Sequence, residues 1–347
     1  MKTKAAILIA HNKPLQIEML ELPSLQTGQV MVKMAFSGVC QSQLMEVTGK
    51  RGDDPYLPHL LGHEGSGEVI EIGEGVSKIK PGDTVVLGWI KGKGLNVPGA
   101  TYKLGDMTVN SGSVTTFTEY AIVAENRCVK IPKGLPVELA PLLGCAIPTG
   151  AGLVLNTLKP KAESSIAFFG LGGIGLSAML ALPSFECAQI IAIDVEAHKL
   201  KLAETLGATH LIDASKVDPI SEINKITKGQ GVDYSVEAAG LVQTIEQAFD
   251  VINLNTGTCI FASHPEHGKK IKLDPFELLC GKKILGSNGG DSVPDIDIPK
   301  YVELYKSGKL DIGRLLSHTY HLDNINDAFL DLKNRKVTRA MIDFSLV

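Results

Sequence analysis

The sequence has no long hydrophobic run, no run of basic residues and no closely spaced group of cysteines. Its most apolar stretch, residues 166–182, contains four glycines and is shorter than the roughly 20 residues that a transmembrane helix needs. Lys and Arg number 34 against 38 Asp and Glu, which gives a net charge of −4 and disfavours a nucleic-acid-binding surface. We therefore expect no membrane span and no nucleic-acid partner, and we predict a buried strand and helix at residues 166–182.

The six cysteines are widely scattered along the chain. The apolar segment at residues 5–10 is shorter than the core of a signal peptide, and no small-residue cleavage site follows it. We interpret this segment as a first β-strand. Scattered cysteines without an export signal are typical of a cytoplasmic protein with reduced thiols, and such thiols are available as metal ligands.

A length of 347 residues suggests about two domains, and 44% hydrophobic with 21% charged residues is ordinary globular composition. Up to about residue 148, short strand-like segments are separated by Gly, Pro and Asp. From residue 149, apolar strands alternate with segments of helical periodicity, which predicts a parallel sheet. The predicted fold class is α/β, with a doubly wound parallel-sheet domain over residues 149–287. This domain interrupts a mostly β domain formed by residues 1–148 and 288–347.

The segment Gly170-Leu171-Gly172-Gly173-Ile174-Gly175 has the pattern G-x-G-x-x-G between a predicted strand and a predicted helix. That context is the one a dinucleotide-binding loop requires. Gly170 permits a tight turn, Gly172 lets the backbone approach a pyrophosphate, and Gly175 lets helix and strand pack closely. Free N–H groups at the start of the helix would then face the phosphates.

Asp194 ends the next predicted strand, 19 residues after Gly175. An acid at this place accepts hydrogen bonds from the adenine ribose and repels a 2′-phosphate, which favours NAD over NADP. The alternative is that Asp194 only caps the following helix.

Cys40, His63 and Cys145 do not have the regular spacing of a zinc finger. A lone cysteine is usually a small buried apolar residue, and a lone histidine usually makes an ordinary hydrogen bond. Their positions alone therefore leave a metal site undecided.

The surrounding sequence adds a resemblance. Gly62-His63-Glu64-Gly65-Ser66-Gly67, followed by Gly73 and Val76, resembles the zinc signature of the medium-chain alcohol dehydrogenase family. Further matches occur in the order of the family: Gly38-Val39-Cys40, Lys80-Pro81-Gly82-Asp83, Leu143-Gly144-Cys145, the Gly-rich loop and Arg339. The resemblance covers nearly the whole chain. It implies a Rossmann domain, a GroES-like catalytic domain and one catalytic Zn²⁺ held by Cys40, His63 and Cys145.

The resemblance also implies roles for other residues. Ser42 would accept the proton of the substrate hydroxyl, and Glu64 would be an acid near the metal. Trp89, the single tryptophan, would line the substrate pocket. The cofactor would be bound by the Gly-rich loop and by Thr149 and Ile174 at the nicotinamide, Asp194 and Lys199 at the adenine ribose, and Arg339 at the pyrophosphate.

The sequence departs from the family in two places. Residues 89–118, where many members carry four structural-zinc cysteines, contain none, so we expect no structural zinc and a lobe held by packing. Gln41, Gln43 and Met45 stand where the family commonly has a basic residue at the pyrophosphate, an aspartate that orients the ligand histidine, and a proton-relay histidine.

We therefore expect a zinc- and NAD(H)-dependent alcohol dehydrogenase for an aromatic or medium aliphatic alcohol. A polyol or sugar-like alcohol is a second possibility, and a glutathione adduct ranks third because residues 100–103 contain no arginine. Two readings from other classes are a zinc-free NADPH-dependent reductase and a non-catalytic dinucleotide-binding protein. The resemblance also implies a homodimer or homotetramer in which strands near residues 259–262 and 284–287 pair across a two-fold axis.

Overall fold

The computed structural model describes residues 1–346 and divides the chain into two compact units. Unit 1 comprises Met1–Cys145, Val293–Gly308 and Ile312–Val347, and unit 2 comprises Ala146–Ser292 with Lys309–Asp311. The boundaries lie a few residues from those expected at residues 148 and 288. Within residues 1–346, no helix is both long and apolar enough to cross a membrane.

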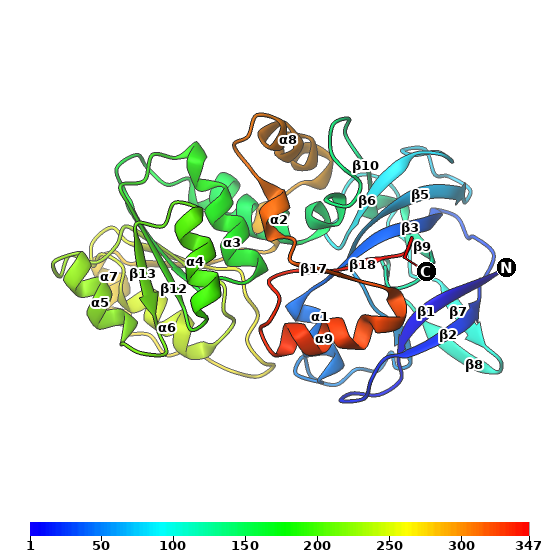
Figure 1. Cartoon of the computed structure of the whole chain (residues 1–347), viewed down its shortest axis with the longest axis horizontal. Helices are drawn as coiled ribbons and strands as arrows, with labels where there is room; N and C mark the ends of the chain where they lie inside the picture. The colour runs from blue at the N-terminus through cyan, green and yellow to red at the C-terminus, as the bar shows by residue number, and fades with distance from the viewer. Residues whose placement is uncertain (347) are drawn as a thin grey trace. The chain divides into compact units, whose positions relative to one another are not determined.

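Unit 1 is built mainly from β-strands (Figure 1). They are β1 (Lys2–Leu8), β2 (Gln16–Glu21), β3 (Gln29–Val39), β4 (His59–Leu60), β5 (Glu64–Ile72), β6 (Thr84–Gly88), β7 (Thr101–Leu104), β8 (Met107–Asn110), β9 (Tyr120–Ala124), β10 (Cys128–Lys130), β17 (His318–Tyr320) and β18 (Ala340–Asp343). The helices are α1 (Gln41–Val47), α8 (Pro294–Lys306) and α9 (Ile325–Lys333), with 3-10 turns η1 (Glu125–Arg127), η2 (Ala140–Gly144), η6 (Ile312–Leu315) and η7 (Leu322–Asn324).

Two sheets share these strands. A closed barrel runs in the order β1-β2-β7-β8-β4, and a seven-stranded sheet runs in the order β10-β6-β5-β3-β18-β17, with β9 also paired to β3. β3 is the central strand, since it pairs with β5, β9 and β18. Its alternate apolar residues Val30, Val32 and Met34 enter one buried cluster. β18 pairs antiparallel with β3, so that Ala340 lies opposite Val39. The C-terminal segment therefore completes the sheet that the N-terminal segment begins.

Unit 2 contains a six-stranded parallel sheet in the order β13-β12-β11-β14-β15-β16. Its strands are β11 (Ser165–Phe169), β12 (Gln189–Asp194), β13 (His210–Asp213), β14 (Tyr234–Glu237), β15 (Thr258–Phe261) and β16 (Lys283–Gly286). Its helices are α2 (Ala146–Gly152), α3 (Gly173–Leu180), α4 (Ala197–Thr205), α5 (Pro219–Ile226), α6 (Val242–Asp250) and α7 (Pro275–Cys280), with the π-helix η3 (Leu153–Leu158) and the 3-10 turns η4 (Leu182–Ser184) and η5 (Gly289–Asp291).

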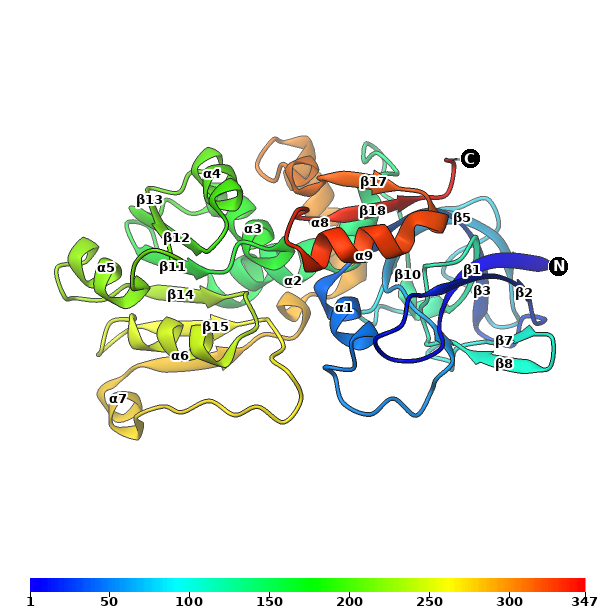
Figure 2. The ribbon, with the colours of Figure 1, turned by 60° about the horizontal axis from the view of Figure 1, so that its bottom comes forward.

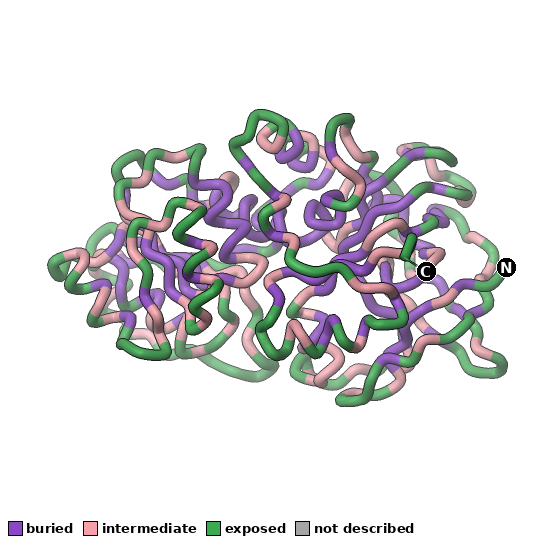
Figure 3. The backbone as a smooth tube through the Cα atoms, viewed as in Figure 1, coloured by how far each residue is buried: buried purple, intermediate pink, exposed green. Residues whose placement is uncertain are grey.

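The order of the strands reverses between β11 and β14, which is the topology of a doubly wound sheet. Figure 2 shows the neighbouring strands of this sheet with α6 packed beside β15. Ala167 and Ile191 of the strands share a buried cluster with Ile223, Ala248 and Phe249 of α5 and α6. In Figure 3 the strands are largely buried and many connecting loops are exposed. The predicted fold class is confirmed.

The cysteine-free stretch at residues 89–118 is anchored by a carboxylate rather than by apolar packing alone. Glu125, 1% exposed, accepts backbone hydrogen bonds from Ser77 at 2.7 Å, Lys78 at 2.8 Å and Leu95 at 2.7 Å. Tyr102 is fully buried, as an apolar anchor should be, whereas Leu95 is 38% exposed. Leu95 still packs against the backbone at two glycines, because a Cβ on Gly28 would lie 3.0 Å from the Cβ of Leu95 and a Cβ on Gly75 would lie 3.1 Å from its Cδ1.

A second carboxylate reinforces this anchor from α8. Asp295 accepts a hydrogen bond from the backbone N–H of Lys93 at 2.6 Å and forms a 2.5 Å ion pair with Lys78. Together, Glu125 and Asp295 hold residues 93–95 of the lobe, and residues 77–78 before it, to the rest of unit 1.

We predict that Glu125→Gln lowers the free energy of unfolding at neutral pH by about 1.5–3 kcal/mol, the range for hydrogen bonds to a charged group. Burial opposes ionisation of Glu125, but the backbone N–H groups of Leu95, Lys78 and Ser77 hold its pKa below the ordinary value. A lowered folded-state pKa means that the stabilisation is complete above the unfolded-state pKa of about 4.3 and is lost as the pH falls through the folded-state pKa.

Urea unfolding of both proteins at several pH values measures this difference. The difference in the free energy of unfolding between wild type and variant should become smaller as the pH is lowered. Glu71→Gln, at an exposed glutamate of β5, is the matched control and should change little. A gap that is constant from pH 7 to acid would contradict the anchoring role.

Candidate metal centre and dinucleotide site

Cys40, His63 and Cys145 come together in unit 1 although more than 100 residues separate the first from the last. Their ligand atoms all lie within 4.8 Å of one another, and no other such group of three occurs in residues 1–346. The antiparallel pairing of β3 with β5 places Cys40, just after β3, near His63, just before β5. Cys145 follows η2, which lies close against β6. A Cβ on Gly144 at the end of η2 would lie 2.2 Å from the carbonyl oxygen of Leu87 in β6.

The protonation of the three ligands is strongly linked. A hydrogen bond from the Cys145 thiol, opposed by burial, holds the pKa of Cys40 well below its ordinary value, and His63 adds to the effect. The same hydrogen bond, together with burial, raises the pKa of Cys145. Burial opposes protonation of His63, but its interaction with Cys40 raises its pKa. Cys40 is therefore the more acidic of the two thiols.

The donor set suits zinc. Two sulfur atoms and one imidazole nitrogen are ligands that Zn²⁺ accepts, with a fourth tetrahedral position left open. The Nε2 atom of His63 is buried and has no hydrogen-bond partner among the described residues. Since an unsatisfied buried polar atom is costly, a metal bound at Nε2 would remove that cost. The residues present fit a zinc ion.

α1 carries two further predicted positions beside the ligands. The hydroxyl of Ser42 donates a hydrogen bond to Sγ of Cys40 at 3.4 Å, which places it next to a ligand atom. Gln43 is 1% exposed, and its Oε1 accepts the backbone N–H of Cys40 at 2.9 Å. Gln43 thus closes the first turn of α1 and fixes the backbone of a ligand. Gln41 is exposed and Met45 is half-buried.

Glu64 and Arg339 form a buried ion pair beside the ligands. The carboxylate of Glu64 accepts a hydrogen bond from the guanidinium of Arg339 at 2.7 Å, and the residues are 0% and 3% exposed. A Cβ on Gly38 would lie 2.3 Å from the Glu64 carboxylate, so only glycine leaves room for it. The pairing of β18 with β3 delivers Arg339 to this place. The resemblance assigned Arg339 to a pyrophosphate, and it gave no sign of its pairing with Glu64.

Trp89 follows directly after β6. The last residue of β6, Gly88, lies opposite Glu64 in the sheet, and a Cβ on Gly88 would lie 2.8 Å from the carbonyl oxygen of Gly144. Gly88 thus lies beside Glu64, which follows His63, and beside Gly144, which precedes Cys145. Trp89 is the next residue in the chain. Its side chain is half-buried, and its carbonyl accepts a hydrogen bond from Arg127.

The Gly-rich loop lies in unit 2 between β11 and α3. Gly170 has φ +90°, a conformation that side chains rarely adopt, and a Cβ on Gly175 would lie 2.0 Å from the carbonyl oxygen of Gly170. A Cβ on Gly172 would meet no atom within 4 Å, so the backbone there is open to a ligand. Gly173 begins α3, followed by Ile174. The free N–H groups at this helix start face the carboxyl edge of the sheet, where ligands of doubly wound folds bind.

Asp194 ends β12 and contacts the Gly-rich loop directly. One carboxylate oxygen accepts the backbone N–H of Leu171 at 2.7 Å, and the other accepts that of Glu196 at 2.9 Å. The N-cap of α4 is Glu196, so Asp194 does not cap the helix. The contact with Leu171 was not predicted, since the spacing indicated only a ribose ligand.

Three predicted cofactor residues lie on the helices of unit 2. Thr149 on α2 is 5% exposed, and its hydroxyl has no hydrogen-bond partner among the described residues. α2 packs tightly on α3: a Cβ on Gly150 of α2 would lie only 2.3 Å from the carbonyl oxygen of Ile174 in α3. Lys199 is half-buried in the first turn of α4.

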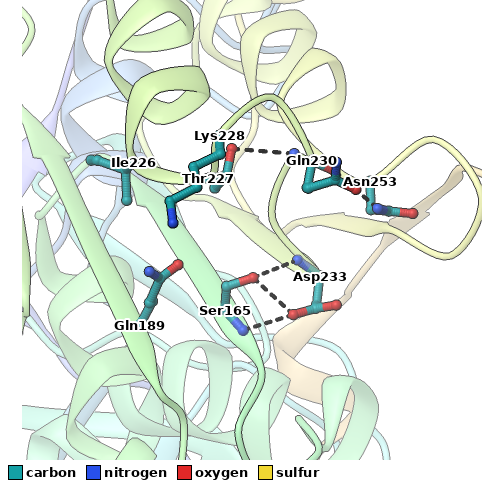
Figure 4. A pocket seen from close by; sticks show the side chains of 9 residues that line it. Ser165, Gln189, Ile226, Thr227, Lys228, Gln230, Asp233 and Asn253 are labelled. Atoms are coloured by element: carbon teal, nitrogen blue, oxygen red, sulfur yellow. Dashed lines mark hydrogen bonds between the residues drawn. The ribbon is translucent and has the colours of Figure 1, made fainter.

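A separate cavity of about 380 Å³ lies at the other end of the sheet (Figure 4). Ser165 and Gln189, the first residues of β11 and β12, line it together with residues near Asn253. The carboxylate of Asp233 accepts hydrogen bonds from both the backbone and the hydroxyl of Ser165, each at 2.8 Å. Because the chain itself uses this acid, the cavity is not a candidate for the chemistry.

We predict that the Glu64–Arg339 pair is strongly coupled. Arg339→Met leaves the buried Glu64 without its cation and should lower the free energy of unfolding by about 3–5 kcal/mol. The double variant Glu64→Gln with Arg339→Met should recover much of that loss, because no buried charge remains. Urea unfolding of the metal-free protein measures the double-mutant cycle, and the exposed pair Glu303–Lys306 serves as the control with near-zero coupling. Additive effects at Glu64 and Arg339 would contradict the prediction.

Comparison with known proteins agrees with this geometry. Residues 26–133 match the alcohol dehydrogenase GroES-like domain, and residues 173–307 match the zinc-binding dehydrogenase domain. S-(hydroxymethyl)glutathione dehydrogenase from Photobacterium damsela subsp. piscicida is 32% identical over 373 residues, covering 99% of this chain and 100% of the relative. The protein of the same name from Escherichia coli (strain SMS-3-5 / SECEC) is 33% identical with the same coverage.

Solved structures agree as well. The crystal structure of benzyl alcohol dehydrogenase from Acinetobacter calcoaceticus matches with a TM-score of 0.90 and 33% identity, covering 99% of this chain and 100% of the other. A zinc-binding-domain alcohol dehydrogenase from Burkholderia ambifaria matches with a TM-score of 0.90 and 32% identity over 99% of each chain. The chain therefore belongs to the zinc-type medium-chain alcohol dehydrogenase family, whose members are oxidoreductases that act on CH–OH groups.

Proposed function

We propose that the protein is an NAD-dependent zinc alcohol dehydrogenase that converts an aromatic or medium aliphatic alcohol and its carbonyl product. The observation that carries the proposal is that the ligand atoms of Cys40, His63 and Cys145 lie within 4.8 Å of one another, with the hydroxyl of Ser42 3.4 Å from a ligand sulfur. A zinc ion held by these three residues would supply Lewis acidity at its open position.

Ser42 takes the proton of the substrate hydroxyl at its Oγ atom in this proposal. A hydroxyl is suited to the task because it both accepts and donates a hydrogen bond. Its contact with Cys40 places it at the metal centre, and the half-buried Met45 offers no group that could pass the proton along α1. The proton would therefore leave through another group or through water.

Glu64 and Arg339 set the charge of the site. Two thiolates and the Glu64 carboxylate would carry three negative charges, which Arg339 and a divalent metal would balance. A neutral buried cluster costs less to desolvate than a charged one. Glu64 therefore acts in this proposal as an oriented acid beside the metal.

The cofactor assignment is supported by the open backbone at Gly172 and by the carboxylate of Asp194 beside the loop. A negative charge at Asp194 would repel the 2′-phosphate of NADP. The unpartnered hydroxyl of Thr149 is a donor for the nicotinamide amide, and Ile174 would press against the ring. We assign Lys199 to the adenine ribose and Arg339 to the pyrophosphate as further proposals.

The half-buried Trp89, which directly follows β6, favours an aromatic substrate, and so does the similarity to benzyl alcohol dehydrogenase. A glutathione adduct is the second candidate, because relatives at 32–33% identity carry the name S-(hydroxymethyl)glutathione dehydrogenase. A polyol, which Arg51 would have to contact, has less support, since Arg51 is exposed and pairs with Glu46 at 3.9 Å. A zinc-free NADPH reductase would not need the gathered ligands.

The first experiment counts zinc in protein purified without added metal, and then compares rates with NAD and NADP. We expect about one zinc per chain, faster turnover with NAD, and higher kcat/KM for benzyl alcohol than for S-(hydroxymethyl)glutathione. Ser42→Ala should lower kcat by about 10²–10⁴-fold with zinc retained, whereas Ser42→Thr keeps the hydroxyl and should retain activity. No zinc, or NADPH use alone, would refute the proposal.

We also propose that the protein forms a homodimer or homotetramer in which a second copy covers the edge of the unit 2 sheet. β16 is the last strand of that sheet, and around it Phe276 is 66%, Leu279 84% and Leu285 44% exposed. An exposed apolar sheet edge is a surface that proteins usually cover.

Light scattering of the purified protein measures this prediction. The mass should correspond to two or four chains, and the double variant Phe276→Lys with Leu279→Lys should lower it to one. Leu241→Lys, at a leucine that is 56% exposed elsewhere on unit 2, is the control. A monomeric wild-type protein would overturn the proposal.

A further inference from the structure

We propose that Glu237 is a positioning residue for the dinucleotide, a role that rests on the proposed NAD dependence. Glu237 is the last residue of β14 and is 0% exposed. It lies at the carboxyl edge of the parallel sheet, where doubly wound folds bind their ligands. Neither the Gly-rich pattern nor the family resemblance singled it out.

The carboxylate of Glu237 joins two loops at this edge. Its Oε1 atom accepts hydrogen bonds from the backbone N–H of Ala239 at 2.9 Å, the backbone N–H of Gly240 at 2.8 Å and the hydroxyl of Thr244 at 2.7 Å. Its Oε2 atom accepts the hydroxyl of Ser263, which follows β15. One side chain thus ties the loop between β14 and α6 to the loop after β15.

The loop that Glu237 holds is packed against the Gly-rich loop. A Cβ on Gly170 would lie 2.7 Å from the backbone nitrogen of Ala239 and 2.8 Å from its Cα. The backbone N–H of Ala238 also donates to the carbonyl of Phe169, the last residue of β11, at 2.8 Å. A displacement of residues 238–240 therefore displaces the turn at Gly170 that sets the phosphate-binding backbone.

The chemistry of Glu237 argues for positioning rather than for stability alone. Among residues 1–346, all its hydrogen-bond partners are neutral donors, so no cation of this part of the chain offsets the desolvation of the carboxylate. Burial raises its pKa, although the hydrogen bonds from Ser263, Thr244, Gly240 and Ala239 oppose that rise. An acceptor with two oxygens is what lets one side chain collect donors from two loops, and it needs no donor of its own.

The experiment measures NADH binding directly, by fluorescence titration of the purified protein with and without added zinc. Glu237→Gln keeps the size of the side chain but replaces one acceptor by a donor and removes the charge. We expect the dissociation constant of NADH to rise about tenfold, the scale of one hydrogen bond to a charged group. The zinc content should stay within about twofold, because the metal ligands are in unit 1.

Single-donor variants keep the proposal testable if Glu237→Gln folds poorly. Thr244→Val and Ser263→Ala each remove one hydrogen bond and should each raise the dissociation constant by a smaller factor. The matched control is Ser235→Ala on the same strand, whose buried hydroxyl donates to the carbonyl of Ala248 and contacts neither loop. This control should lower stability without changing NADH binding.

The outcomes separate the two proposals. Unchanged NADH affinity in Glu237→Gln, or in both Thr244→Val and Ser263→Ala, would overturn the role of Glu237. A loss of kcat at constant NADH affinity would overturn it too. A wild-type protein that binds neither NADH nor NADPH would instead refute the proposed function, whatever the variants do.

Discussion

The buried ion pair between Glu64 and Arg339 is the constraint on which unit 1 depends. Neither side chain is solvated, so each needs the other, and Arg339 reaches Glu64 only if β18 lies against β3. The C-terminal segment is thereby tied to the strand that leads into Cys40. Gly38 is part of the same constraint, because a side chain there would collide with the Glu64 carboxylate. Sheet order, a glycine and an ion pair together fix the place of a metal ligand.

Carboxylates hold backbone segments together throughout this chain. Glu125 gathers N–H groups from two segments of unit 1, Asp194 joins the Gly-rich loop to the turn before α4, and Glu237 joins two loops of unit 2. The cysteines are free thiols, so no disulfide takes this part. An ionised carboxylate suits the task because it accepts several N–H donors, each stronger than a neutral hydrogen bond. The acids therefore explain how loops with little apolar burial keep their positions.

Local patterns predicted unit 2 well and unit 1 only in part. The strand and the helix predicted within residues 166–182 correspond to β11 and α3, because an apolar run that stops at a glycine shows where its strand ends. The barrel strands β4, β7 and β8 were not predicted, since segments of two to four residues hold no detectable period. The helix predicted to run to residue 182 ends at Leu180, and a 3-10 turn follows at Leu182–Ser184.

The site shows the same division. A motif of consecutive residues, such as the Gly-rich loop, could be predicted from the sequence because its spacing is set by local backbone geometry. The hydrogen-bond partners of Arg339, Glu125 and Glu237 could not be predicted. Each contact depends on tertiary pairing of strands or loops, which the local sequence pattern does not indicate. The resemblance named Cys40, His63 and Cys145 as ligands, and only the three-dimensional structure places their donor atoms together.

Asp194 shows how such tertiary contacts bear on binding. A carboxylate offers about four lone-pair sites. The N–H groups of Leu171 and Glu196 use one on each oxygen, which leaves one on each oxygen for a ribose hydroxyl. The acid is thus held in position before any ligand arrives, and little side-chain entropy remains to be lost on binding. The same contact ties Asp194 to the Gly-rich loop, so that a displacement of one displaces the other.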